Sequence, residues 1–294
     1  MITHYIDLED CVLDIILYTV KMLISFITTI KICKNYEFLV DRINIYILNV
    51  QHYCKKYDIP YEILICEQVN EKNIMLVKDK LQNTENVSLI ELIQTYDNPL
   101  SFNLIESYGK NECLLKANGK YTCMTSADQM FSEDFFIFIK HSLHKGVFYR
   151  FATFEVPAIN IDNVLQQNDV ESLLSYCANA DKRLCNPGCF ESHVNSIKLG
   201  QKSGDIMLLD TESFKYIKGW PETICFTHMD CAVCMVATNN FPHFIPDKNI
   251  CSYTFSQSTR YTGEKIININ GNDISIENFQ WQIALTYLNK KTCN

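Results

Sequence analysis

Two apolar segments, LISFITTIKI at residues 23–32 and YEILIC at residues 61–66, decide the fold. Both are rich in β-branched residues and neither alternates with polar residues, as a strand buried on both faces of a sheet requires. Between them, residues 36–56 carry apolar side chains at helical spacing. A strand, a helix and a strand in this order form the βαβ unit of a parallel sheet with a right-handed crossover. The sequence therefore predicts an α/β fold.

The same alternation continues along the chain. We expect further strands at 87–90, 121–125, 148–156 and 205–209, and further helices at 7–21, 109–117, 132–144 and 211–217. Ser132 is the expected N-cap of its helix, because acidic residues follow it in the first turn. Residues 160–201 are polar and irregular, which predicts an inserted loop. We expect a helical extension at 1–21, a single domain over 22–262, and a C-terminal segment at 263–294 packed on that domain.

Composition excludes several classes of protein. With 294 residues, 47% hydrophobic and 20% charged, the chain can bury a sizeable core, which excludes a disordered protein. The net charge of -8 argues against a protein that binds nucleic acid through its phosphates. Fourteen cysteines spread over a chain of this size imply no disulfide framework. Residues 12–32 are apolar but interrupted by Asp14, Lys21 and Lys31, so we expect no membrane span.

The expected compartment is the cytoplasm, because the first ten residues are acidic where a secretory signal is basic. Ile, Asn, Lys and Tyr are abundant while Gly and Pro are scarce, as is typical of an AT-rich genome. A virus is one candidate source, and the host cytoplasm is then the expected compartment.

Motifs along the chain carry a resemblance to a known family. They are, in order, ISFITT at 24–29, YEILICE at 61–67, KNEC at 110–113, ANGKY at 117–121, TSADQMFS at 125–132, SGDIMLL at 203–209, GWPE at 219–222 and HMD at 228–230. In this order and spacing they resemble the nucleotide-sugar glycosyltransferases of GT-A fold, in the broad family-2-like group. The resemblance covers residues 22–262. It implies a Rossmann-like, mostly parallel sheet flanked by helices.

The resemblance also implies an activity: transfer of a sugar from a UDP-type donor to a hydroxyl of a glycan or other acceptor, with inversion of configuration. On the donor side it implies binding by Thr28, Glu67, Asn111 and Asp128. On the acceptor side it implies catalysis by Asp230 as the base, with Glu222 and His228 beside it. Such a transfer needs neutralisation of the leaving diphosphate and removal of the acceptor proton, so residues of both kinds are expected.

A divalent ion, Mn²⁺ or Mg²⁺, is the implied cofactor, and Asp128 is its implied protein ligand. Hard oxygen ligands suit these ions, and Mg²⁺ often takes only one or two carboxylates. The chain departs from the family here: Ser126 stands at the first acidic position of the motif, and Thr254 and Gln257 stand where relatives often place His. Cationic candidates to assist the diphosphate are Lys31, Arg150, Lys202 and Arg260.

Other interpretations stay open. A non-catalytic module that binds a nucleotide or glycan could keep this fold, and Ser126 favours it. A membrane-associated scaffold could use the first thirty residues as an interfacial helix. By position alone, Asp128 is a turn residue and Asp230 is a helix N-cap or first-turn acid. Cys231 and Cys234, with Cys185 and Cys189, have spacing that is poor for a zinc site.

Overall fold

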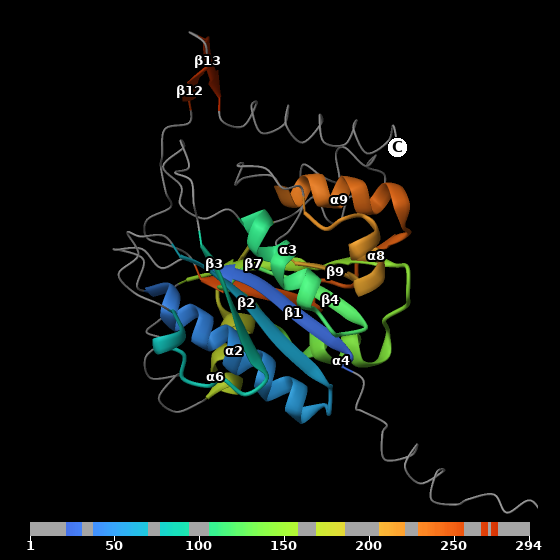
Figure 1. Ribbon diagram of the computed structural model, residues 1–294. Helices are drawn as coiled ribbons and strands as arrows, with labels where there is room; N and C mark the ends of the chain where they lie inside the picture. Colours follow the sequence, from blue (N-terminus) through green and yellow to red (C-terminus); the bar gives the residue numbers. More distant parts are fainter. Residues whose placement is uncertain are drawn as a thin grey trace, which may run out of the picture.

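The computed structural model describes residues 22–30, 38–69, 77–93, 106–157, 169–185, 206–220, 229–255, 266–269 and 272–275. Its centre is a seven-stranded sheet in the order β10-β6-β9-β4-β1-β2-β3, with helices on both faces (Figure 1). The predicted helix at 7–21 lies outside the described residues, as does most of 263–294. The strands of this sheet are β1 (Ile24–Ile30), β2 (Tyr61–Val69), β3 (Val87–Ile93), β4 (Tyr121–Met124), β6 (Phe148–Arg150), β9 (Met207–Asp210) and β10 (His243–Phe244).

The predicted βαβ unit is confirmed. Strand β1 pairs in parallel with both β2 and β4, and β2 pairs in parallel with β3. All seven residues of β1 are buried, as expected for a strand covered on both faces. Strand β9 is the antiparallel member, since it runs opposite to its neighbours β4 and β6. The carboxyl ends of β1, β2 and β4 therefore meet at one edge of the sheet.

One face of the sheet is covered by α2 (Phe38–Lys56), α4 (Glu133–His141) and α6 (Val170–Asn179). Ser132 caps α4 by accepting from Phe135 N, as predicted. A second sheet joins this layer in the order β5-β11-β7-β8. Its strands are β5 (Met130–Phe131), β11 (Cys251–Phe255), β7 (Ala152–Val156) and β8 (Arg183–Leu184). Aromatic side chains of β1, β5 and α4 pack together here, with Phe131 and Phe135 stacked at 4.3 Å.

The other face carries α3 (Glu106–Lys116), α8 (Thr211–Tyr216) and α9 (Met229–Asn240), seen above the sheet in Figure 1. Helix α3 approaches β1 and β2 closely at Gly109. A Cβ atom there would overlap the Thr29 side chain and lie 3.2 Å from the Cys66 Cβ atom. The glycine therefore sets the distance between α3 and the sheet.

Asn49 fixes the chain around β5. From α2, its Nδ2 donates to Phe131 O at 3.1 Å and its Oδ1 accepts from Phe131 N at 2.9 Å. The turn that contains Asp128 lies between β4 and β5, so this bidentate contact holds one end of that turn against α2.

Two predictions about secondary structure were wrong. The single strand predicted at 148–156 is two strands, β6 and β7, which belong to different sheets. Burial is nearly complete from Phe148 to Ala152, so no change of pattern marks the break at Phe151. The loop predicted at 160–201 contains α6 and β8. Asp169 is the N-cap of α6. The buried apolar residues of this helix, from Val170 to Cys177, recur at helical spacing among polar residues.

The described part of the C-terminal segment is a hairpin. Strands β12 (Ile266–Ile269) and β13 (Asn272–Ser275) pair antiparallel in a two-stranded sheet of their own. That this segment packs on the domain stays a prediction.

Candidate donor site at the carboxyl edge

Thr28 and Glu67 lie on the same face of the main sheet. Across the parallel register Thr28 is level with Ile65, and Ile30 is level with Glu67. Side chains alternate along a strand, so both point to the face that α2 covers. Both residues are fully buried. Glu67 was expected at the end of its strand, but β2 continues to Val69 and places the carboxylate inside the sheet.

Each of these two side chains has a buried polar atom without a hydrogen-bond partner among the described residues. They are Thr28 Oγ1 and Glu67 Oε2. The other carboxylate oxygen, Oε1, accepts from Val77 N at 2.6 Å. Burial raises the pKa of Glu67 above its usual value, and the hydrogen bond from Val77 opposes that shift. Buried polar atoms are usually paired, so these two offer hydrogen-bonding capacity that a ligand or an ordered water would use.

Asp128 lies in the turn after β4 and is bound from two sides. Arg42 Nη1 donates to Asp128 Oδ2 at 3.3 Å, and Thr254 Oγ1 donates to the same oxygen at 3.1 Å. The Asp128 side chain is 19% exposed and that of Arg42 is 8% exposed. Helix α2, the turn after β4 and strand β11 thus meet at one carboxylate. Thr254, noted in the sequence as a replacement for His, does lie beside the motif carboxylate.

These contacts do not fit the implied divalent ion. Asp128 already has a neighbouring positive charge, and the motif's other acidic position is Ser126. Within the part of the chain that the structure describes, no group of three or more His, Cys, Asp or Glu side chains could hold a metal ion. A divalent cation on Asp128 would lie close to the Arg42 guanidinium and be repelled by it.

Arg42 is the residue that the sequence interpretation missed. Of the four cations suggested there, Arg150 is buried in β6, and Lys31, Lys202 and Arg260 lie outside the described residues. The sequence did contain an indication of its role. Arg42 stands four residues before Tyr46 and seven before Asn49, the spacing of residues on one face of a helix. That face of α2 is buried. A cation on the buried face of a helix requires a partner.

The side chain of Asn111 makes hydrogen bonds within the fold. Its Nδ2 donates to Trp220 O at 2.9 Å, and its Oδ1 accepts from Trp220 N at 2.8 Å. The side chain is therefore bound to the segment after α8, on the α3 face of the sheet. A role of Asn111 in donor binding stays a prediction.

Asp230 lies in the first turn of α9 and is partly buried. Helix α9 ends near the amino edge of the sheet, because Pro242 O accepts from Phe148 N at the start of β6. A helix of 12 residues is ~18 Å long. The first turn, with Asp230, thus lies about this distance along the helix from the turn near the amino edge. The other two predicted catalytic residues, Glu222 and His228, lie outside the described residues.

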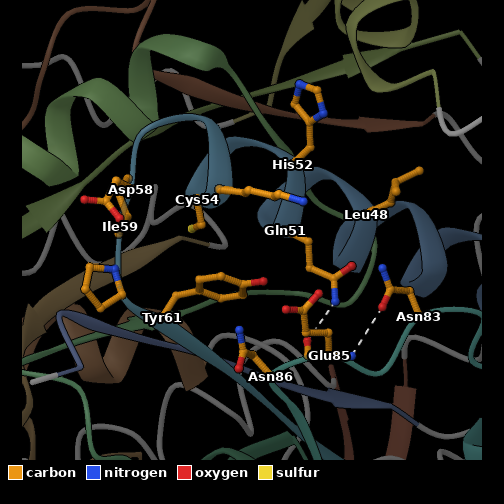
Figure 2. Close-up of a pocket in the computed structure, with 12 residues that line it drawn as sticks. Leu48, Gln51, His52, Cys54, Asp58, Ile59, Tyr61, Asn83, Glu85 and Asn86 are labelled. Carbon is orange, nitrogen blue, oxygen red and sulfur yellow. Dashed lines mark hydrogen bonds between the residues drawn. The ribbon is translucent and has the colours of Figure 1, made fainter. Parts of the chain in front are cut away.

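A separate pocket of about 480 Å³ lies at the opposite end of β2 (Figure 2). Figure 2 shows Gln51 of α2 reaching toward Glu85, whose carbonyl oxygen accepts from Gln51 Nε2 at 2.8 Å. Tyr61, the first residue of β2, lines the same pocket. None of the predicted donor or catalytic residues lines it.

No protein-family model and no curated protein matches the sequence. Among solved structures, S. aureus TarS 1–349 in complex with UDP-GlcNAc matches with a TM-score of 0.51 at 14% identity, over 82% of this chain and 60% of that one. The fold is GT-A.

Two further GT-A structures match with TM-scores below 0.5. The catalytic domain of Drosophila β1,4-galactosyltransferase 7, in complex with xylobiose, has a TM-score of 0.47 at 10% identity, over 85% of this chain and 77% of that one. A mannosyltransferase from Pyrobaculum calidifontis, in complex with GDP-Man and Mn²⁺, has a TM-score of 0.46 at 11% identity, over 82% of this chain and 58% of that one. This chain spans 60% of the TarS fragment and is 14% identical to it. At such a low identity the likeness shows the GT-A fold alone.

The GT-A fold confirms the predicted fold class, a mostly parallel sheet flanked by helices in one domain. Among the described helices, none has the length and apolar character that crossing a bilayer requires.

Proposed function

We propose that this protein is a glycosyltransferase that moves a sugar from a UDP-type donor to a hydroxyl group of a glycan or other acceptor, with inversion. The observation that carries the proposal is a GT-A sheet with Thr28 and Glu67 in the carboxyl-terminal halves of β1 and β2, and with the Arg42–Asp128 pair at the turn after β4. Open α/β sheets bind their ligands outside the carboxyl ends of the strands.

The proposed roles follow from the chemistry of each group. Glu67 can accept a hydrogen bond from the imide of uracil, because its Oε2 has no partner among the described residues. Thr28 can bond the ribose with its Oγ1, which is likewise without a partner there. Asp230, in the first turn of α9, removes the acceptor proton, the role that the resemblance to GT-A glycosyltransferases implies for it. Glu222 and His228 are proposed to orient the acceptor.

The transfer is a single displacement in this proposal. The acceptor oxygen bonds to the anomeric carbon while the bond from that carbon to the phosphate oxygen breaks. The electron pair of the broken bond stays on the diphosphate, and the acceptor proton goes to the Asp230 carboxylate. Such a base contributes about 10²- to 10⁴-fold to the rate.

A non-catalytic nucleotide-binding module is the second candidate. It is favoured by the pairing of Asp128 with Arg42 and Thr254, which occupies the carboxylate expected to hold the metal. The two candidates differ in turnover: a binding module retains nucleotide affinity but releases no UDP from a UDP-sugar.

The experiment is a panel of nucleotide sugars screened by thermal shift, followed by measurement of UDP release. A ligand at 100 times its Kd stabilises the folded protein by ~2.7 kcal/mol, which raises Tm by roughly 5–10 °C for a chain of this size. A UDP-sugar that raises Tm and is turned over supports the enzyme. A shift without turnover, in the presence of candidate glycan acceptors, supports the module. Failure of every nucleotide to shift Tm contradicts both.

A further inference from the structure

Arg42 is held rigidly at the carboxyl edge of the sheet. Its Nη1 donates to Asp128 Oδ2 at 3.3 Å and to Phe255 O at 3.2 Å. The guanidinium carbon lies 5.0 Å from the centre of the Phe38 ring. The side chain is 8% exposed, so this positive charge has a fixed position between α2, the turn after β4 and the end of β11.

Among the described residues, part of the guanidinium has no hydrogen-bond partner. Nη1 donates both hydrogen bonds, while the three N–H groups of Nη2 and Nε make none among the described residues. These three N–H groups form one side of the planar fork that matches phosphate oxygens in a bidentate contact. A pre-oriented arginine of this kind loses little conformational entropy when it binds an anion.

The charge balance at Asp128 differs from that of a metal site. One carboxylate and one guanidinium sum to zero, and Thr254 adds a hydroxyl that donates to the carboxylate. A divalent ion needs acidic oxygens, whereas a diphosphate needs positive charge. Here the Asp128 carboxylate is already paired with Arg42, whereas Arg42 keeps N–H groups that make no hydrogen bond among the described residues.

We propose that Arg42 binds the diphosphate of the donor, so that binding and departure of the nucleoside diphosphate require no divalent metal ion. The inference rests on the proposed function. In the transfer step described above, the leaving diphosphate gains the electron pair of the broken bond, and the Arg42 charge stabilises it. Asp128 is then a positioning residue, which holds Arg42 through Nη1, while Nη2 and Nε have no partner among the described residues.

The first test is calorimetric titration of the full chain with UDP and with uridine, in EDTA and in Mn²⁺. The wild-type protein is expected to bind UDP equally, within about twofold, under the two conditions. Arg42→Gln is expected to weaken UDP at least tenfold while changing uridine affinity less than twofold, because only UDP carries the phosphates. Arg183→Gln is the matched control: Arg183 is an exposed arginine paired with Glu155, and its loss should change neither affinity.

Asp128→Asn separates the two models even if Arg42→Gln does not fold. Asparagine keeps an oxygen for Arg42 and Thr254 but removes the negative charge. In our proposal UDP affinity is then unchanged or higher, because the Arg42 charge is no longer neutralised. If Asp128 were a metal ligand, the same change would lower UDP affinity in Mn²⁺ at least tenfold.

The outcomes distinguish this inference from the proposed function. UDP binding that needs Mn²⁺ and is lost in Asp128→Asn overturns the role of Arg42 and leaves the glycosyltransferase intact. Failure of UDP to bind, with or without Mn²⁺, overturns the proposed function and the inference with it. Metal-independent UDP binding that Arg42→Gln weakens supports both.

Discussion

The side chain of Asn111 bonds both polar groups of the Trp220 backbone, donating to its carbonyl oxygen at 2.9 Å and accepting from its N–H at 2.8 Å. Trp220 is buried, and the Lys110 ammonium lies 4.0 Å from the centre of its ring. In the sequence, Trp220 stands two residues before Glu222, the first predicted acceptor residue. Helix α3 therefore fixes Trp220, the last described residue before the predicted acceptor segment.

Asn111→Leu should lower the free energy of unfolding by about 2–4 kcal/mol. It leaves the Trp220 N–H and C=O buried without these partners, and each such group costs ~1–3 kcal/mol. Urea unfolding measures the change. Asn179→Leu, at an exposed position of α6, is the control and should stay within ~0.5 kcal/mol. Equal losses in the two variants would show that the Asn111 contact contributes nothing to stability.

Gly109→Ala should destabilise the protein by about 1–3 kcal/mol, because the added methyl group overlaps the Thr29 Cγ2 atom in a packed core. Thr29→Ser removes that atom and keeps the hydroxyl. The double variant should therefore recover most of the loss, and a double-mutant cycle in urea should give a favourable coupling energy of at least ~0.5 kcal/mol. Additive effects would mean that the contact with Thr29 does not limit the approach of α3.

Local patterns predicted much of the fold, because the order of apolar and polar residues within β1, α2 and β2 is enough to show which of their positions are buried. An uninterrupted apolar run and a helical period are readable without knowing the partners. Strands β6 and β7 were not separable in this way. Their residues are buried alike, and only pairing with β9 and with β11 shows that they belong to different sheets.

The candidate site was predicted less completely, for a related reason. Glu67 and Asp128 belong to motifs that lie next to strands, so their positions followed from the strands. The pair of Arg42 with Asp128 joins residues 86 positions apart, and no local pattern records such a contact. Thr254 meets the same carboxylate from 126 positions away. The sequence therefore did not predict that Arg42 and Thr254 are the partners of Asp128. Only the three-dimensional structure shows these contacts.

Glu67→Gln should make stability less dependent on pH. Burial raises the pKa of Glu67 in the folded protein above its unfolded value, so its favourable contribution is fully present below the unfolded pKa and is lost as pH rises through the folded pKa. Loss of the proton from this buried carboxyl group therefore lowers stability as the pH rises, whereas glutamine has no proton to lose in this range. The stability of Glu67→Gln relative to wild type should therefore be greater at pH 7 than at pH 4.

Urea unfolding at the two pH values tests this, with Glu91→Gln as the control, because Glu91 is exposed and paired with Lys78. A relative stability of Glu67→Gln that is the same at both pH values would contradict the burial argument. The same variant bears on the donor site, since glutamine is a weaker acceptor than a carboxylate. UDP affinity should fall by ~1–2 kcal/mol if Glu67 bonds the uracil imide.

Asp230→Asn should separate catalysis from donor binding. Asparagine keeps the shape of the side chain but cannot take the acceptor proton, so turnover should fall by about 10²- to 10⁴-fold. UDP affinity should stay within about twofold, because a base that acts on the acceptor contributes little to holding the diphosphate. Stability should fall by no more than ~1 kcal/mol, the usual value of an acid in the first turn of a helix.

The measurements are UDP release from the donor that the nucleotide-sugar panel selects, calorimetric titration with UDP, and urea unfolding. Asp247→Asn, in an exposed turn before β11, is the control and should behave as wild type in all three. Normal turnover in Asp230→Asn would remove Asp230 from the mechanism and make Glu222 the next carboxylate to test. Loss of UDP affinity would instead assign Asp230 to the donor side. A fall in turnover with UDP affinity retained supports a role of Asp230 on the acceptor side, because a carboxylate that held the donor would change both quantities together.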